Sequence, residues 1–188
     1  MKVSNLLVIA AYTSCMASFS WAMRRFFVKS KPPFNLEQRL IIYLGALWAL
    51  LHIGALLIAP SLGPVPLALG LLCCSASLAL FWSAIQANRA QPLHWAFESD
   101  KPRHLVAIGP YRWIRHPFYL SYSLCWVAPA LATKYLPLFL PVCVMLVLYW
   151  RASSREERGF LSSPFAEEYR QYQTQAGRFW PKWNVGEN

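Results

Sequence analysis

Cationic, aromatic and turn-forming residues are concentrated in one stretch of this chain, from Arg103 to Tyr119, between two long apolar runs. The stretch contains the turn Gly109-Pro110 and then His116-Pro117, where the next apolar run begins. Proline suits the first position of a helix, and the free N–H groups of the following turn can receive an anion or a carboxylate. The stretch therefore predicts a binding site for a charged ligand at a membrane boundary.

A simpler interpretation exists for part of this stretch. Arg112, Trp113 and Arg115 could form an ordinary belt of cationic and aromatic residues at the membrane interface. Such a belt explains each residue singly but not the whole string, so binding remains the favoured interpretation.

A second polar segment, residues 151–188, holds half of the chain's eight acidic residues in two adjacent pairs. The first pair, Glu156-Glu157, lies on the expected continuation of an apolar helix. Pairing with arginines along that helix would explain these acids structurally, at only about 0.2–0.5 kcal/mol for each pair. The second pair, Glu167-Glu168, follows Ser163-Pro164, where a further helix is predicted to begin with acids near its positive end.

Composition indicates that these segments belong to a membrane protein. Hydrophobic residues make up 56% of the 188-residue chain, and charged residues only 14%. A membrane span needs about 20 apolar residues, so the uncharged runs predict about five transmembrane helices in one all-α domain. The expected spans are residues 3–23, 40–60, 65–87, 116–133 and 135–151, with site segments 88–116 and 151–188.

The distribution of Lys and Arg predicts the orientation of these spans. Sixteen of the eighteen lie in residues 24–39, in residues 88–116 or after residue 150, and only Lys2 and Lys134 lie on the other side. By the positive-inside rule, the N-terminus is outside, and the C-terminal helical tail is cytoplasmic. We expect a multi-pass protein of a bacterial inner membrane or a eukaryotic endoplasmic reticulum, with its active site facing the cytoplasm.

The same arrangement accounts for the net charge of +10, because basic residues face anionic lipid headgroups. We therefore expect membrane lipids as partners and no nucleic acid. The five cysteines lie within apolar runs without metal-ligand spacing, so no metal is expected. His52 lies within the second span, where a neutral imidazole bonded to an adjacent helix is favoured over a functional role. The third span has a small-residue face made of Gly70, Cys73, Cys74 and Ser77.

The two polar segments together resemble the integral-membrane methyltransferases that include isoprenylcysteine carboxyl methyltransferase and phosphatidylethanolamine N-methyltransferase. The resemblance extends from about residue 100 to residue 181. It rests on His104-Leu-Val, Gly109-Pro-Tyr-Arg, Arg115-His-Pro-Phe-Tyr119, Glu156-Glu157, Tyr169-x-x-Tyr172 and Arg178-x-x-Pro181. It implies a methyltransferase that uses S-adenosyl-L-methionine and methylates a lipophilic acceptor, a carboxylate or an amine, that enters from the bilayer.

By position, the resemblance also implies a set of cofactor contacts. These are Arg103, His104, Leu105, Val106, Tyr111, His116, Pro117, Phe118, Tyr119 and Glu156. Glu156 would receive the methionine ammonium, and His116 or backbone N–H groups its carboxylate. The aromatic faces of Tyr111 and Tyr119 would favour the sulfonium charge.

Arg115 and Arg151 are predicted as catalytic residues. Members of the family often carry an arginine that contacts substrate four residues before the paired glutamates, but Ala152 stands there in this chain, so Arg151 is the nearest candidate. Methyl transfer is an in-line displacement, so positioning should supply most of the rate, and neither a metal nor a covalent nucleophile is required.

Two other classes of protein stay open. Sterol-reductase-like membrane oxidoreductases, which use NADPH, share an Arg-His-x-x-Tyr element but usually have more spans. A non-catalytic membrane protein of the same fold is the other alternative. The paired glutamates favour the methyltransferase, whose acceptor could be a prenylcysteine, a phospholipid amine or a small lipophilic molecule.

Overall fold

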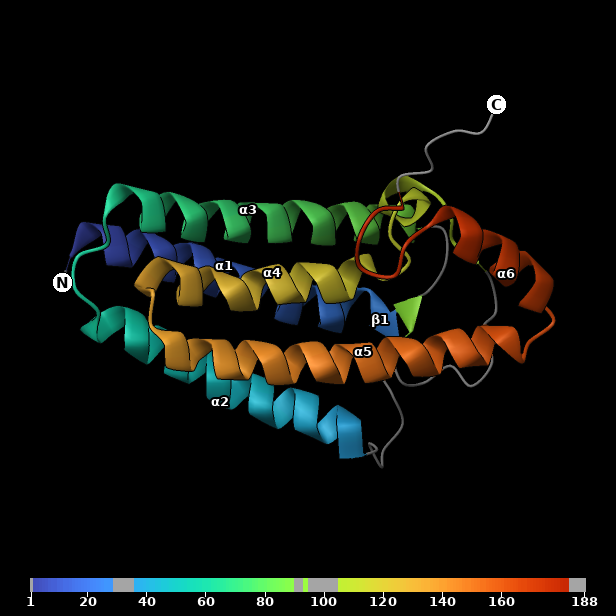
Figure 1. The fold of residues 1–188 in the computed structure, drawn as a ribbon, viewed down its shortest axis with the longest axis horizontal. Coiled ribbons are helices and arrows are strands. Elements are labelled where there is room, and N and C mark those ends of the chain that lie inside the picture. Colours follow the sequence, from blue (N-terminus) through green and yellow to red (C-terminus); the bar gives the residue numbers. More distant parts are fainter. Residues whose placement is uncertain (1, 29–35, 90–92, 95–104, 183–188) are drawn as a thin grey trace.

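The computed structural model describes residues 2–28, 36–89, 93–94 and 105–182 as a bundle of long helices (Figure 1). The helices are α1 (Val3–Arg25), α2 (Leu36–Ile58), α3 (Pro64–Ala87), α4 (Pro117–Thr133), α5 (Phe139–Leu161) and α6 (Ala166–Gln175), with 3-10 turns η1 (Gly109–Arg112) and η2 (Leu136–Leu138). Strands β1 (Phe27–Val28) and β2 (Leu93–His94) form a two-residue parallel pair, Phe27 beside Leu93. The expected all-α class is confirmed.

Proline and turn residues determine several helix ends. Proline occupies a first-turn position in both α3 and α4. The expected turn near Thr133-Lys134 is confirmed: Lys134 ends α4 in the left-handed conformation, at φ 57°. Helix α6 begins at Ala166, slightly after the predicted start, because the Ser163 hydroxyl accepts the N–H of Phe165 in a turn before the helix (3.1 Å).

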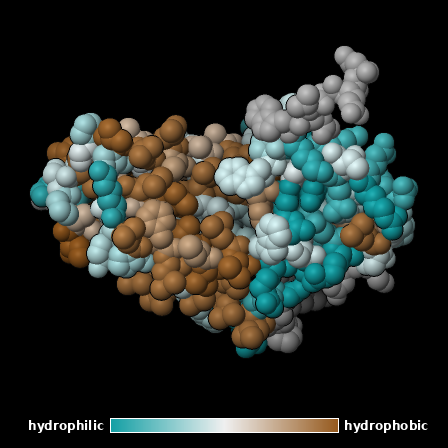
Figure 2. All heavy atoms as spheres, in the orientation of Figure 1, coloured by the Kyte–Doolittle hydropathy of each residue, from teal (hydrophilic) through white to brown (hydrophobic). Residues whose placement is uncertain are grey.

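Among the described residues, four segments are long and apolar enough to span a membrane: α1, α2, α3 and Leu136–Leu161. Helix α2 begins at Leu36, four residues before the predicted span, and α5 continues beyond residue 151 to Leu161. Helix α4 has 17 residues, so the total of five spans stays a prediction, as does their orientation. Figure 2 shows a broad hydrophobic surface over most of the bundle and a hydrophilic end around α6.

Helices α3 and α4 are packed closely through the small-residue face of α3. Gly70 lies so near α4 that a Cβ atom there would be 3.0 Å from the Cβ of Ala132. The Ser77 hydroxyl donates to the carbonyl of Ser121 at 2.7 Å. Gly70, Cys74 and Ser77 are buried, whereas Cys73 is half-exposed. The prediction of a contact face is therefore confirmed for three of its four residues.

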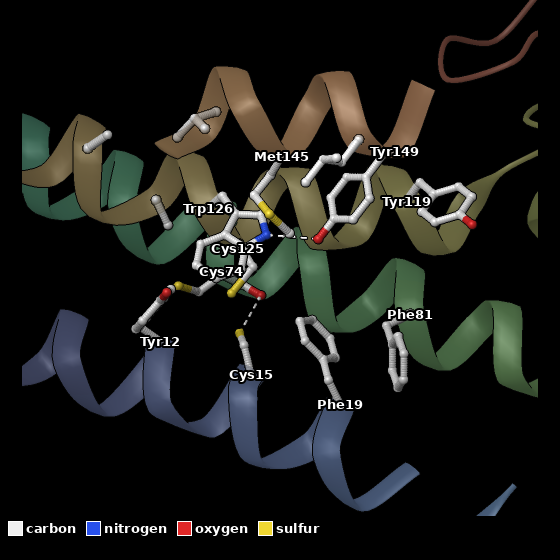
Figure 3. Packing of buried hydrophobic residues seen from close by; sticks show 14 of the residues in the cluster. Tyr12, Cys15, Phe19, Cys74, Phe81, Tyr119, Cys125, Trp126, Met145 and Tyr149 are labelled. Atoms are coloured by element: carbon white, nitrogen blue, oxygen red, sulfur yellow. Dashed lines mark hydrogen bonds between the residues drawn. The ribbon is translucent and has the colours of Figure 1, made fainter. Parts of the chain in front are cut away.

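Aromatic and sulfur-containing side chains fill the core between α1, α3, α4 and α5 (Figure 3). Cys15, Cys74 and Cys125 are buried there, as expected of small packing residues, whereas Cys143 is exposed. The Cys15 thiol donates weakly to the carbonyl of Cys74 (3.5 Å). The indole N–H of Trp126 donates to the Tyr149 hydroxyl at 3.0 Å, which joins α4 to α5 inside the core.

The close contact at Gly70 can be tested with two matched glycine substitutions. Gly70→Ala should lower the melting temperature, because overpacking at such a contact costs about 1–3 kcal/mol. Gly54→Ala on α2 is the control: a Cβ there meets nothing within 4 Å, so alanine should leave stability unchanged or raise it. Thermal unfolding of both variants in detergent measures the difference. Equal responses would contradict the close α3–α4 contact.

Candidate functional site

Charged side chains from three segments meet at the hydrophilic end of the bundle. The segments are the start of α4, the last turns of α5 and the residues after α6 (Figure 1). We call the set Arg115, His116, Glu156, Glu157 and Arg178 the charge cluster. The two polar stretches singled out by the sequence therefore lie side by side in the structure.

Local backbone geometry brings the first of these segments into place. Gly109 has a φ of +59°, and a Cβ there would lie 3.1 Å from the Cβ of Ala87, so this turn against α3 favours glycine. His116 then precedes the first residue of α4, Pro117, which is fully buried. The side chains of Arg115 and His116 are thereby fixed at the end of the bundle.

The tail segment, residues 176–181, pairs with the backbone just before α4. The N–H of Gly177 donates to Trp113 (3.0 Å), the N–H of Arg115 to Gly177 (2.7 Å), and the N–H of His116 to Arg178 (3.1 Å). A Cβ on Gly177 would lie 1.8 Å from the carbonyl oxygen of Trp180, so only glycine fits this turn. This pairing carries Arg178 into the charge cluster.

Glu157 is the shared acceptor of the charge cluster. Its Oε1 accepts from Arg115 Nε (3.0 Å) and Nη2 (2.9 Å) and from His116 Nε2 (3.1 Å). Its Oε2 accepts from Arg178 Nη2 (2.6 Å) and Gln173 Nε2 (3.3 Å). Only 5% of its side chain is exposed. With both oxygens occupied by donors of the protein, Glu157 is suited to holding the cluster together.

The two arginines of the charge cluster have further partners. Arg115 Nη1 donates to the backbone carbonyl of Ala176. Arg178 Nη1 donates to the Ser154 hydroxyl at 2.8 Å, and its guanidinium lies over the ring of Trp150, 4.3 Å from the centroid. Both guanidinium groups are thus held by α5 and the tail segment, which favours a positioning role for them.

Glu156 has a different environment from its neighbour. Its Oε1 accepts from the Tyr119 hydroxyl (2.6 Å), and its Oε2 lies 3.4 Å from His116 Nδ1. Its side chain is 21% exposed, about four times the exposed fraction of Glu157. The ring of Tyr119 stacks on Tyr149, with centroids 5.2 Å apart. Glu156 is therefore held by two side chains yet keeps an accessible surface.

His116 lies between the two carboxylates, one at each ring nitrogen. Burial alone lowers the pKa of His116, but hydrogen bonds to Glu156 and Glu157, together with their negative charges, outweigh burial and raise the pKa above its ordinary value. A doubly protonated imidazolium can donate from both nitrogens at once. The geometry and the raised pKa agree on a charged His116.

Four of the other predicted cofactor residues have the following surroundings in the described structure. The Tyr111 hydroxyl accepts from Asn88 (3.0 Å), and the Tyr111 carbonyl accepts from Tyr172 (2.7 Å). The ring of Phe118 contacts Phe27 and Phe81, and Leu105 packs against Tyr169 and Tyr172. Val106 is half-buried, and Arg103 and His104 lie outside the described residues.

Arg151, predicted as catalytic, lies on another side of α5. Five residues along a helix correspond to a rotation of about 140°, so Arg151 and Glu156 point in different directions. The Arg151 guanidinium pairs with Glu37 of α2 at 3.1 Å, and its side chain is 65% exposed. Ala152, which occupies the family's arginine position, is fully buried. The structure thus brings Arg115, but not Arg151, into the charge cluster.

The sequence did not predict a site role for three residues that bond to one another at this end of the bundle: Glu157, Arg178 and Gln173. Arg178 was noted only as part of a motif, and nothing in the spacing indicates that it returns to α5. The position of Glu157 next to Glu156 was the signal in the sequence that could have indicated a role for Glu157. Two neighbouring acids on a helix do not by themselves show which one is buried.

Comparison with known protein families agrees with this arrangement. Residues 65–168, more than half of the chain, match the model of the phospholipid methyltransferase family, and the chain belongs to this family. The match includes α3, α4, α5 and four of the five residues of the charge cluster. A search of curated proteins found no significant match. The family and the apolar helices together define the class as an integral-membrane methyltransferase.

The charged state of His116 predicts how stability depends on pH. Because the pKa is raised on folding, the stabilisation is fully present below about pH 6.5 and is lost as pH rises through the folded-state pKa. The melting temperature should therefore fall from pH 6.5 toward pH 9, and His116→Gln should flatten this dependence. An equally steep fall in His116→Gln would contradict a buried imidazolium.

Proposed function

We propose that this protein is an S-adenosyl-L-methionine-dependent methyltransferase that acts on a lipophilic, membrane-associated acceptor bearing a carboxylate or an amine. The observation that carries the proposal is the accessible carboxylate of Glu156, held by Tyr119 and His116 at the end of an apolar bundle. Membership of a methyltransferase family supports the reaction type.

The residues around Glu156 fit the charged groups of this cofactor. A carboxylate that retains exposed surface can accept a hydrogen bond from an ammonium group, as Glu156 would from the methionine portion. Both ring nitrogens of His116 are taken by Glu156 and Glu157, so we propose that the carboxylate of the cofactor is bound by backbone N–H groups near His116. The faces of Tyr119 and Tyr111 suit a sulfonium centre. The cofactor supplies the activated methyl group.

The chain contributes binding, orientation and the exclusion of water. Arg115 and Arg178 keep Glu157 in place, and Glu157 fixes His116, which in turn contacts Glu156. In an in-line displacement, such fixed geometry lowers the barrier by holding reactants in line. We therefore assign Arg115 a positioning role in the proposed reaction, and we propose that Arg151 acts at the α2–α5 contact.

The apolar surface of the bundle supports a lipophilic acceptor. The hydrophobic surface in Figure 2 continues up to the hydrophilic end, where the charge cluster lies. Exposed large side chains on α2 and α5, such as Leu50 and Val147, are 69% and 58% exposed. An acceptor with a long apolar tail could remain in the bilayer while its polar group reaches Glu156 and Tyr119.

We further propose that the charge cluster faces the cytoplasm. The start of α2 and the ends of α1, α3 and α5 lie at the same end of the bundle as α6, whereas the N-terminus and the α4–α5 turn lie at the other (Figure 1). Among the described residues, twelve of the fourteen Lys and Arg belong to segments at the first end. Positive charge on that side favours a cytoplasmic location.

Substitution of the two glutamates separates cofactor binding from stability. Glu156→Gln should weaken S-adenosylmethionine binding by about 1–3 kcal/mol, because a charge-assisted partner is lost. Glu157→Gln should instead lower the melting temperature, because removal of one member of a buried ion pair costs about 3–5 kcal/mol. Calorimetry and thermal unfolding on detergent-purified protein measure the two effects.

The control for both variants is Glu167→Gln, whose side chain is 89% exposed and pairs only with Arg170 among the residues described. It should change neither quantity. Unchanged cofactor affinity in a folded Glu156→Gln protein would remove Glu156 from the binding site. Absence of any S-adenosylmethionine binding to the wild-type protein would contradict the proposed function itself.

Reporter fusions test the orientation independently of activity. A reporter fused after Asn188, or inserted within residues 90–102, should be cytoplasmic, and one inserted at residues 61–63 should not. Fluorescence or enzymatic reporters active on one side of the membrane give the readout. An external C-terminal reporter would reverse the proposed orientation and place the charge cluster away from cytoplasmic cofactor.

A further inference from the structure

Two polar side chains that are buried inside the bundle, away from the charge cluster, each have one atom without a hydrogen-bond partner. Tyr12 of α1 and His52 of α2 both have 0% exposed surface. Within the part of the chain that the structure describes, the Tyr12 hydroxyl and His52 Nε2 have no partner. Buried polar groups in native proteins are almost always satisfied by protein or by ordered water, so the pair calls for a physical explanation.

The contacts of His52 determine what Nε2 can do. His52 Nδ1 lies 2.7 Å from the backbone carbonyl of Trp48, one turn earlier on its own helix. A carbonyl only accepts, so Nδ1 carries the proton, and Nε2 of the neutral ring is an acceptor. The sequence predicted a neutral imidazole that bonds to an adjacent helix. The predicted partner is wrong, because the observed bond lies within α2.

The two unpartnered atoms are complementary, and they belong to neighbouring rings. The Tyr12 hydroxyl can donate, and His52 Nε2 can accept. Their ring centroids lie 6.1 Å apart, and both rings contact Trp126, at 6.4 Å for Tyr12 and 5.8 Å for His52. Figure 3 shows Tyr12 pointing from α1 into the core toward Trp126. One small molecule or group that both accepts and donates would satisfy both atoms.

We propose that Tyr12 and His52 form a binding site for a single hydroxyl group within the membrane-embedded core. The oxygen of that hydroxyl accepts from Tyr12, and its O–H donates to His52 Nε2. The hydroxyl belongs either to a water molecule or to a lipophilic alcohol that enters from the bilayer.

A chain of contacts joins this hydroxyl site to the charge cluster. Trp126, which contacts both rings of the site, donates to the Tyr149 hydroxyl, and Tyr149 stacks on Tyr119. The Tyr119 hydroxyl donates to Glu156. The occupant of the hydroxyl site therefore supports the packing of side chains that reach the proposed methyltransferase site, although its own binding does not depend on that function.

The sign of the stability change on Tyr12→Phe tests the proposal. If a hydroxyl occupies the site, the variant loses a hydrogen bond, and its melting temperature falls, by about 2–4 °C for a bond of ordinary strength. If the site is unoccupied, the variant removes an unpaired polar atom, and its melting temperature stays the same or rises. Tyr149→Phe is the matched control: loss of the Trp126 bond should lower the melting temperature in either case.

A second measurement on the wild-type protein decides the matter even if Tyr12→Phe fails to fold. Solid-state NMR of histidine-labelled protein in lipid vesicles reports whether magnetisation passes from water to Nε2 of His52. The His52 signal is assigned by its loss in His52→Gln. Transfer identifies water as the occupant. Without transfer, 1-dodecanol is added: an increase in melting temperature for the wild type but not for Tyr12→Phe identifies an alcohol.

Two results would overturn the hydroxyl site. The first is an unchanged or raised melting temperature for Tyr12→Phe beside a lowered one for Tyr149→Phe. The second is the absence of both water transfer and a dodecanol effect, which would leave a direct Tyr12–His52 bond as the explanation. Neither result bears on S-adenosylmethionine binding, so failure here is distinguishable from failure of the proposed function.

Discussion

The burial of one carboxylate, that of Glu157, determines how the end of this bundle is built. An ionised carboxylate that leaves water is stable only when cations and hydrogen-bond donors surround it. Two segments supply those donors: the start of α4 through Arg115 and His116, and the tail segment through Arg178. Because both segments must reach the two oxygens of a residue on α5, the start of α4, the end of α5 and the tail segment are fixed relative to one another.

The adjacent pair of glutamates divides structural and chemical roles between neighbouring residues. Successive residues on a helix differ by about 100° in direction, so Glu157 points into the cations while Glu156 points toward Tyr119 and remains accessible. His116 contacts both carboxylates and transmits the fixed position of one to the other. Glu156 is thus an acidic group that Tyr119 and His116 hold in position and that still keeps exposed surface.

The sequence predicted those features that depend on short-range signals. The lengths of the apolar runs predicted the long helices, and Pro117 and Lys134 predicted the two ends of α4. These predictions succeed because proline, turn residues and hydrophobic runs act locally. The role of Arg178 could not be predicted, since it depends on backbone pairing of Gly177 with a segment about 60 residues earlier. The site residues themselves stay predictions until cofactor binding is measured.

Ion pairs at the hydrophilic end also connect the least buried long helix to the rest. Only 11% of the apolar part of α2 is buried inside the bundle, the smallest share among the four long apolar segments described. Glu37 at its first turn pairs with Arg151 and Arg155 of α5, just before the glutamate pair. These pairs are partly exposed, and such contacts contribute only about 0–1 kcal/mol each. The ion pairs between α2 and α5 are therefore weaker than the buried ion pairs of the charge cluster beside them.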